Sequence, residues 1–194
     1  TYALITVLNT ATGLLAYTQS NFTPTFSPVK GTITDADFNP KVDFNSGVGP
    51  HTVAIGDLDG DGKADIVIGN ALRTTVSVLR NTSILGTISY ADKVEFEVGL
   101  SPFSVSIGDL DGDGKADLAV ANYGSNTISI LRNAGSTGII SYAAKVDFTT
   151  GTYPNSVSIG DLDENGKADL AVVNNNNVSV FLNNGTVGTI SFHK

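Results

Sequence analysis

Three short acidic stretches contain the residues with the clearest potential for chemistry. Each places side-chain oxygens at positions 1, 3, 5 and 9 and a glycine at position 6, and the stretches begin at residues 57, 109 and 161. Because alternate residues of a tight loop can point at one centre, each stretch predicts a site for a hard cation such as Ca²⁺, which takes about six to eight oxygen ligands. The predicted side-chain ligands are Asp57, Asp59, Asp61 and Asp65, then Asp109, Asp111, Asp113 and Asp117, then Asp161, Asp163, Asn165 and Asp169.

The residue after the loop glycine is a lysine in all three stretches, and its backbone carbonyl is expected to join the ligands: Lys63, Lys115 and Lys167. An EF-hand loop begins in the same way but needs a glutamate at position 12. Here that position holds Ile68, Val120 and Val172, within an apolar β-branched run. The sequence therefore predicts three Ca²⁺ ions in loops that join strands rather than helices. A solvated acidic turn is the alternative for any single loop, and the repetition argues against it.

The period of 52 residues extends well beyond these loops. Phe44, Phe96 and Phe148 are in register. The second unit contains four strand-like segments at about 93–98, 104–108, 117–121 and 127–132, which turn residues separate. Four short strands in a unit of about 50 residues are typical of a β-propeller blade. The chain is therefore predicted to be all-β, with three blades of four antiparallel strands and no substantial helix.

The units resemble the FG-GAP/VCBS repeat family, whose blades also build the head of integrin α chains. The second unit carries the resemblance in Phe96, Gly99, Pro102 and the run 104–122, and the resemblance covers about residues 38–192. It implies Ca²⁺ bound between the second and third strands of a unit, and an extracellular setting. It does not fix one function, because such propellers serve in adhesion, carbohydrate binding and scaffolding.

The predicted blades span residues 38–89, 90–141 and 142–191, and residues 192–194 are the stub of a next repeat. Residues 1–37 are predicted to hold the last strand of a preceding blade, Leu4–Asn9, followed by an inserted loop. Because a propeller ring needs about four to eight blades, three blades leave open sheet edges that can pair with another chain. We expect assembly with other copies into a ring or fibre, or further blades of a longer chain. The absence of an initial Met favours a processed form or a fragment.

The composition excludes several classes of function. The chain of 194 residues has a net charge of −8 and no cysteine, so it has neither disulfides nor a thiol site. Eleven of its 19 acidic residues are predicted ligands in the three loops, so the acidity is mainly a property of the predicted metal sites. The negative charge argues against binding to nucleic acid. No apolar run of about 18 residues occurs, so no membrane span is expected.

Candidate catalytic groups are few. His51 occupies a position that holds Phe103 and Asn155 in the other units, and His193 lies at the end of the chain. The acids outside the loops include Asp43, Glu95 and Asp147, which recur at one strand position and predict a solvated face. No nucleophile–base pair is apparent. A non-catalytic structural or adhesive module, extracellular and stabilised by calcium, is therefore predicted. A propeller-type polysaccharide hydrolase or lyase is one alternative.

A lectin-like, carbohydrate-binding propeller is the other alternative. The chain has no tryptophan, but Tyr90, Tyr123, Tyr142 and Tyr153 are candidate platforms for a sugar. Tyr90 and Tyr142 are equivalent in the repeat, which favours packing instead. The expected partners are other copies of the chain, glycans or extracellular proteins. Four sequons predict N-glycosylation in a host with that machinery: Asn21, Asn81, Asn177 and Asn184.

Overall fold

A computed structural model of the chain describes residues 7–8, 15–16 and 40–193. The chain divides into two units, Thr1–Lys41 and Val42–Lys194. In the first unit, β1 (Val7–Leu8) pairs antiparallel with β2 (Leu15–Ala16). β1 falls within the strand predicted at Leu4–Asn9. The remainder of that strand, and the predicted insertion over residues 18–37, lie outside the described residues.

The second unit consists of three four-stranded antiparallel sheets, which do not close into a ring. Sheet 1 contains β3 (Pro50–Gly56), β4 (Asp65–Asn70), β5 (Thr75–Leu79) and β6 (Val94–Glu97). Sheet 2 contains β7 (Pro102–Gly108), β8 (Asp117–Asn122), β9 (Thr127–Leu131) and β10 (Val146–Thr149). Sheet 3 contains β11 (Ser156–Gly160), β12 (Asp169–Val173), β13 (Val178–Asn183) and β14 (Phe192–His193). No described residue is helical, so the prediction of an all-β protein with propeller-type blades is confirmed, and none of the described segments is a helix that could span a membrane.

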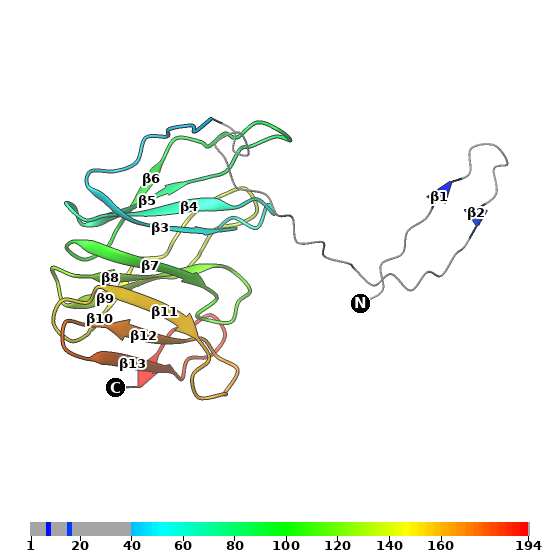
Figure 1. Ribbon diagram of the computed structural model, residues 1–194. Helices are drawn as coiled ribbons and strands as arrows, with labels where there is room; N and C mark the ends of the chain where they lie inside the picture. The colour runs from blue at the N-terminus through cyan, green and yellow to red at the C-terminus, as the bar shows by residue number, and fades with distance from the viewer. Residues whose placement is uncertain (1–6, 9–14, 17–39, 194) are drawn as a thin grey trace, which may run out of the picture. The chain divides into compact units, whose positions relative to one another are not determined.

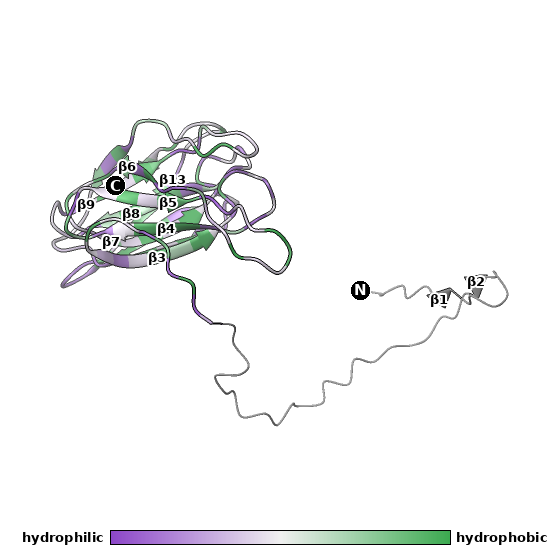
Figure 2. Cartoon of the chain, turned by 90° about the horizontal axis from the view of Figure 1, so that it is seen from above, coloured by the Kyte–Doolittle hydropathy of each residue, from purple (hydrophilic) through white to green (hydrophobic). Residues whose placement is uncertain are grey.

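The sheets stack face to face, with sheet 1 and sheet 3 at opposite ends (Figure 1). One core cluster lies between sheets 1 and 2 and includes Val67 and Val120, and a second lies between sheets 2 and 3 and includes Ala119 and Leu170. Successive side chains of a strand point to opposite faces, so β8 supplies residues to both clusters. This explains its continuous apolar run, and the green apolar segments of the stacked strands are visible in Figure 2.

The sheets are shifted by one strand relative to the sequence units. The segment predicted at 93–98, in the unit 90–141, forms β6 and pairs with β5 of sheet 1, with Val76 opposite Phe96 and Val78 opposite Val94. β10 pairs with β9 in the same way. Sheets 1 and 2 each therefore take their outer strand from the unit that follows in the sequence. The repeat in the sequence gives the period of the structure but not the first strand of each sheet. That depends on which strand edge offers its unpaired N–H and C=O groups to the segment.

Sheet 3 departs from this pattern at its outer edge. β14 pairs only through Leu182–His193 and Asn183–Phe192, and the second of these pairs corresponds to the isolated bridges Asn81–Tyr90 and Asn133–Tyr142 in the other sheets. The predicted stub at 192–194 thus contributes this bridge. Within the described residues, no strand runs beside Val178–Phe181 in the place that β6 and β10 occupy beside β5 and β9.

We predict that Leu118→Ala lowers the free energy of unfolding by about 2–5 kcal/mol, because truncating this buried side chain leaves a cavity between sheets 1 and 2. Leu72→Ala is the matched control, since Leu72 is 73% exposed in the turn after β4. It should change stability by less than about 0.5 kcal/mol. Urea unfolding followed by circular dichroism measures both. Equal effects of the two substitutions would contradict the assigned core.

Candidate metal centres

Each acidic loop connects the first two strands of its sheet and brings three carboxylates together. One oxygen from each member of a trio lies within 4.8 Å of the others. The trios are Asp57, Asp59 and Asp61; Asp109, Asp111 and Asp117; and Asp161, Asp163 and Asp169. Like charges at this separation repel one another, and a bound cation removes that repulsion. The prediction of one acidic cluster per repeat, with the spacing of a metal site, is confirmed.

The first aspartate of each loop organises the loop backbone. Asp57 Oδ1 accepts hydrogen bonds from the N–H groups of Gly60 at 2.8 Å and Asp61 at 3.2 Å, and Asp57 Oδ2 accepts one from Gly62 at 2.9 Å. Gly62 has φ +84°, in the left-handed region that glycine adopts without steric cost. The glycines at the same position of the other loops have φ values of +85° and +81°, as the sequence predicts for a sharp turn: Gly114 and Gly166.

The aspartate at position 9 has a structural role that sequence reasoning missed. Asp117 Oδ2 accepts the N–H of Leu110 at 2.9 Å, and its Oδ1 accepts the N–H of Asn133 at 2.7 Å. The carboxylate therefore ties the start of the loop to the segment after β9. Burial raises the pKa of Asp117 to about 6, and the charges of Asp111 and Asp113 add to this, against the two hydrogen bonds. The equivalent residues Asp65 and Asp169 make the same pair of contacts.

Two further side chains at the sites were not singled out from the sequence. Arg80 Nε lies 2.7 Å from Asp59 Oδ2, whereas Arg132 Nη1 lies 3.7 Å from Asp111 Oδ2. Sheet 3 has Leu182 at the equivalent position. The sequence could have indicated these arginines, because Arg80 and Arg132 occupy the same position of the repeat, at the same distance from their acidic loops.

The donor set of each cluster fits a hard cation such as Ca²⁺. Every side chain offers oxygen, and Asp111 Oδ2 is buried without a hydrogen-bond partner. Two of the predicted ligands, Asp113 and Asn165, accept the N–H of the lysine two residues on at 2.9 and 2.8 Å, and the lysine carbonyls remain predicted ligands. The Lys115 ammonium donates to Gly135 O at 3.0 Å, so this side chain makes a contact of its own.

The histidine and tyrosine candidates are engaged in packing. The ring of His51 stacks on Phe103 with centroids 4.1 Å apart, and His51 Nδ1 lies 3.1 Å from Phe103 O. Tyr123 stacks between Phe103 and Tyr153, with centroid distances of 4.4 and 4.8 Å. Its two faces are thereby covered. Tyr90 and Tyr142 pack edge-to-face on phenylalanines, as their equivalence in the repeat predicted: Phe44 and Phe96.

The remaining candidates are not members of the three carboxylate clusters. The equivalent acids Asp43, Glu95 and Asp147 are exposed, and the last two form ion pairs with lysines of their own strand segments. The Asn81 amide donates to Ala64 O at 2.8 Å, whereas Asn177 and Asn184 are exposed, and Asn21 lies outside the described residues. Glycosylation of the four sequons remains a prediction.

Comparison with known proteins identifies the repeat. A family model described as FG-GAP-like repeat matches residues 57–120 and again residues 109–172, which together span more than half of the chain. The chain belongs to the FG-GAP-like repeat family. Each match begins at an acidic loop and ends in the second strand of the following sheet, so that one FG-GAP-like match spans two successive acidic loops. No curated protein matches the chain.

We predict that, without metal, this FG-GAP-like protein becomes less stable as the pH rises from about 4 to 7. The pKa of Asp117 is about 6 in the folded state, above the ordinary value of 3.8, so the folded state binds more protons in this window and deprotonation favours unfolding. Calcium binds the deprotonated carboxylates, so the stabilisation by calcium should grow as the pH passes 6.

Urea unfolding of metal-stripped and calcium-loaded protein between pH 4.5 and 7.5 measures this dependence. Asp117→Asn is the control, because it removes the titrating group and should flatten the metal-free slope. A metal-free stability that rises across the window would contradict the prediction.

Proposed function

We propose that this chain is a non-catalytic structural or adhesive module that acts outside the cell and is stabilised by calcium. The observation that carries the proposal is the recurrence of one carboxylate cluster in each of three stacked sheets. Short loops with three or four carboxylates suit dissociation constants on the order of 10⁻⁴–10⁻³ M, the range of extracellular modules. Calcium at or above such concentrations would occupy the sites and would act as part of the fold.

The position of the clusters supports a structural role for the metal. Asp65, Asp117 and Asp169 each bind two backbone N–H groups, so their loops are joined to the end of the third strand in the same sheet. An ion at the cluster would cancel the repulsion between the loop carboxylates and hold this junction. Among the described residues outside the loops, no group of three or more acidic or histidine side chains lies close enough to hold a metal ion, so the close carboxylate clusters are those of the loops.

Carbohydrate binding is the second candidate function. It rests on Tyr153, which ends the aromatic stack and is 48% exposed. The inner rings of the stack cover one another, so they offer no free face for a sugar. A glycan array compared between the native protein and Tyr153→Ala would test this candidate.

We also propose that the module assembles through its open sheets, with other copies of itself or with further blades of a longer chain. The support is that three sheets of this kind do not close into a ring, and an open edge with unpaired N–H and C=O groups is a template for pairing.

We predict that removing calcium with a chelator lowers the melting temperature by about 10 °C, because three sites each contribute binding free energy to the folded state alone. Isothermal titration should give three Ca²⁺ ions per chain. Asp109→Asn should reduce this number to two, since it weakens one cluster. Glu95→Gln, an exposed acid outside the clusters, is the matched control and should leave it unchanged. A melting temperature that is indifferent to the chelator would refute a structural metal.

A further inference from the structure

The outer face of sheet 3 exposes residues that are buried wherever another sheet follows. We call this surface the tail face and define it by Gly160, Leu162, Val173, Val178 and Val180. Leu162 is 52% exposed, whereas its counterparts in sheets 1 and 2 are 2% exposed: Leu58 and Leu110. Val178 and Val180 are 59% and 51% exposed, whereas the counterparts of both are at most 1% exposed: Val76, Ile128, Val78 and Ile130.

The opposite end of the stack shows the complementary pattern. We call this surface the head face and define it by Val53 and Ile55 of β3 with Ile66 and Ile68 of β4. Val53 is 62% exposed, whereas its counterparts in sheets 2 and 3 are 8% and 5% exposed: Val105 and Val157. Ile55 is 67% exposed. The head face and the tail face are thus equivalent to the two surfaces that meet between sheets 1 and 2 and again between sheets 2 and 3.

The internal contacts have a fixed steric pattern. Ile107 of sheet 2 packs over Gly56 of sheet 1, where an added Cβ would lie 3.2 Å from the isoleucine Cδ1. Ile159 of sheet 3 packs over Gly108 in the same way, at 3.1 Å. The next glycine in the series, Gly160, has open space above it, and the matching isoleucine is Ile55 on the head face.

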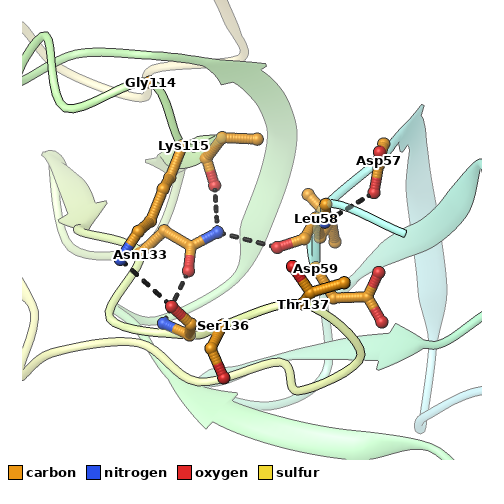
Figure 3. Close-up of a pocket in the computed structure, with 11 residues that line it drawn as sticks. Asp57, Leu58, Asp59, Gly114, Lys115, Asn133, Ser136 and Thr137 are labelled. Carbon is orange, nitrogen blue, oxygen red and sulfur yellow. Dashed lines mark hydrogen bonds between the residues drawn. The ribbon is translucent and has the colours of Figure 1, made fainter. Parts of the chain in front are cut away.

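Hydrogen bonds repeat across both internal contacts. Asn133 Nδ2 donates to Leu58 O of the preceding sheet at 2.8 Å, as Figure 3 shows, and Asn183 Nδ2 donates to Leu110 O at 2.7 Å. The N–H groups of Gly138 and Gly188 donate to the preceding loops at 3.1 and 2.9 Å, where the acceptors are Asp59 O and Asp111 O. The equivalent acceptors at the tail end of the molecule are Leu162 O and Asp163 O. The equivalent donors at the head end are the side-chain amide of Asn81 and the N–H of Gly86.

The outer edge of β13 identifies the strand that completes it. β5 and β9 are paired at this edge by segments whose sequences are Lys-Val-Glu-Phe and Lys-Val-Asp-Phe. A third such segment, Lys-Val-Asp-Phe at 41–44, precedes sheet 1 and lies outside its strands. Phe44 packs edge-to-face on Tyr90 at 5.0 Å, as Phe96 packs on Tyr142 at 5.0 Å. The ring of Phe44 therefore packs on sheet 1 as the ring of Phe96, in β6, packs on the segment that bridges to sheet 2.

We propose that a second copy of this chain docks its head face on the tail face and adds Val42–Phe44 as the missing strand beside β13. By the register of β5 with β6, Phe44 of the second copy lies opposite Val178, and Val42 lies opposite Val180. This proposal names the partner and the contact for the assembly in the proposed function, and it rests on that part of it. The contact is head-to-tail, so it builds a ring if its rotation closes and a filament otherwise. Two copies supply six sheets, within the range of about four to eight that closes a propeller.

The test uses light scattering coupled to size-exclusion chromatography on the full chain in calcium, over a range of concentrations. The native chain should assemble. Val53→Arg blocks the head face and Val180→Arg blocks the tail face, and each should raise the dissociation constant by about a hundredfold or more. Val146→Arg is the matched control and should assemble as the native chain does. Val146 is 53% exposed on the middle sheet, outside both end faces.

Mixing the two blocked variants tests the polarity of the contact. The intact head of Val180→Arg fits the intact tail of Val53→Arg, so an equimolar mixture should form a dimer and nothing larger. Dimers of either variant alone would show a head-to-head or tail-to-tail contact and would overturn the proposal. A native chain that stays monomeric in calcium at all concentrations would also overturn it. Calcium-dependent melting of the same samples reports separately on folding and on the structural metal.

The register can be tested with cysteines, because the chain has none of its own. Val42→Cys mixed with Val180→Cys should form an intermolecular disulfide under mild oxidation. Val42→Cys mixed with Ser179→Cys should not, because residue 179 points to the other face of the strand. Equal cross-linking of the two mixtures would overturn the proposed pairing.

Discussion

The buried carboxylate at the end of each acidic loop is the contact on which the rest of a sheet depends. Asp117 binds one N–H at the start of the loop and another beyond the third strand, so one side chain fixes both ends of the segment between them. A neutral amide would have a single acceptor oxygen for these two donors. The same carboxylate is buried close to other acids, so it holds the sheet together at an electrostatic cost that a cation offsets.

This arrangement would make a bound metal and the sheet interdependent. The backbone N–H groups of the turn hold the first aspartate of the loop in place. The asparagine after the third strand extends the connection. Asn133 donates to Ala116 O of its own loop and also, as Figure 3 shows, to Leu58 O of the preceding sheet. The electrostatic state of one site is thereby linked to the contact between two sheets.

The sequence predicted those parts of the structure that recur with the period. Strands, acidic clusters and loop glycines all depend on local residue types, which the three units share. The assignment of β6 to sheet 1 could not be predicted in the same way, because Val94–Glu97 carries the same alternation whichever neighbour it joins. The second role of Asp65, Asp117 and Asp169 also escaped prediction. An aspartate that binds a cation and one that binds backbone amides look identical in a sequence, and only the contacts made in the folded chain distinguish them.

The one-strand shift between sequence unit and sheet has a consequence for how such a protein can lengthen. A duplicated unit brings an outer strand for the sheet before it and an incomplete sheet of its own. The added unit completes the sheet of the unit before it, and its own sheet then lacks an outer strand. The number of sheets that lack an outer strand is therefore independent of the number of units. Tandem duplication changes the length of the array but keeps an open sheet edge at its end. Only closure of the array into a ring or pairing with a partner removes that open edge.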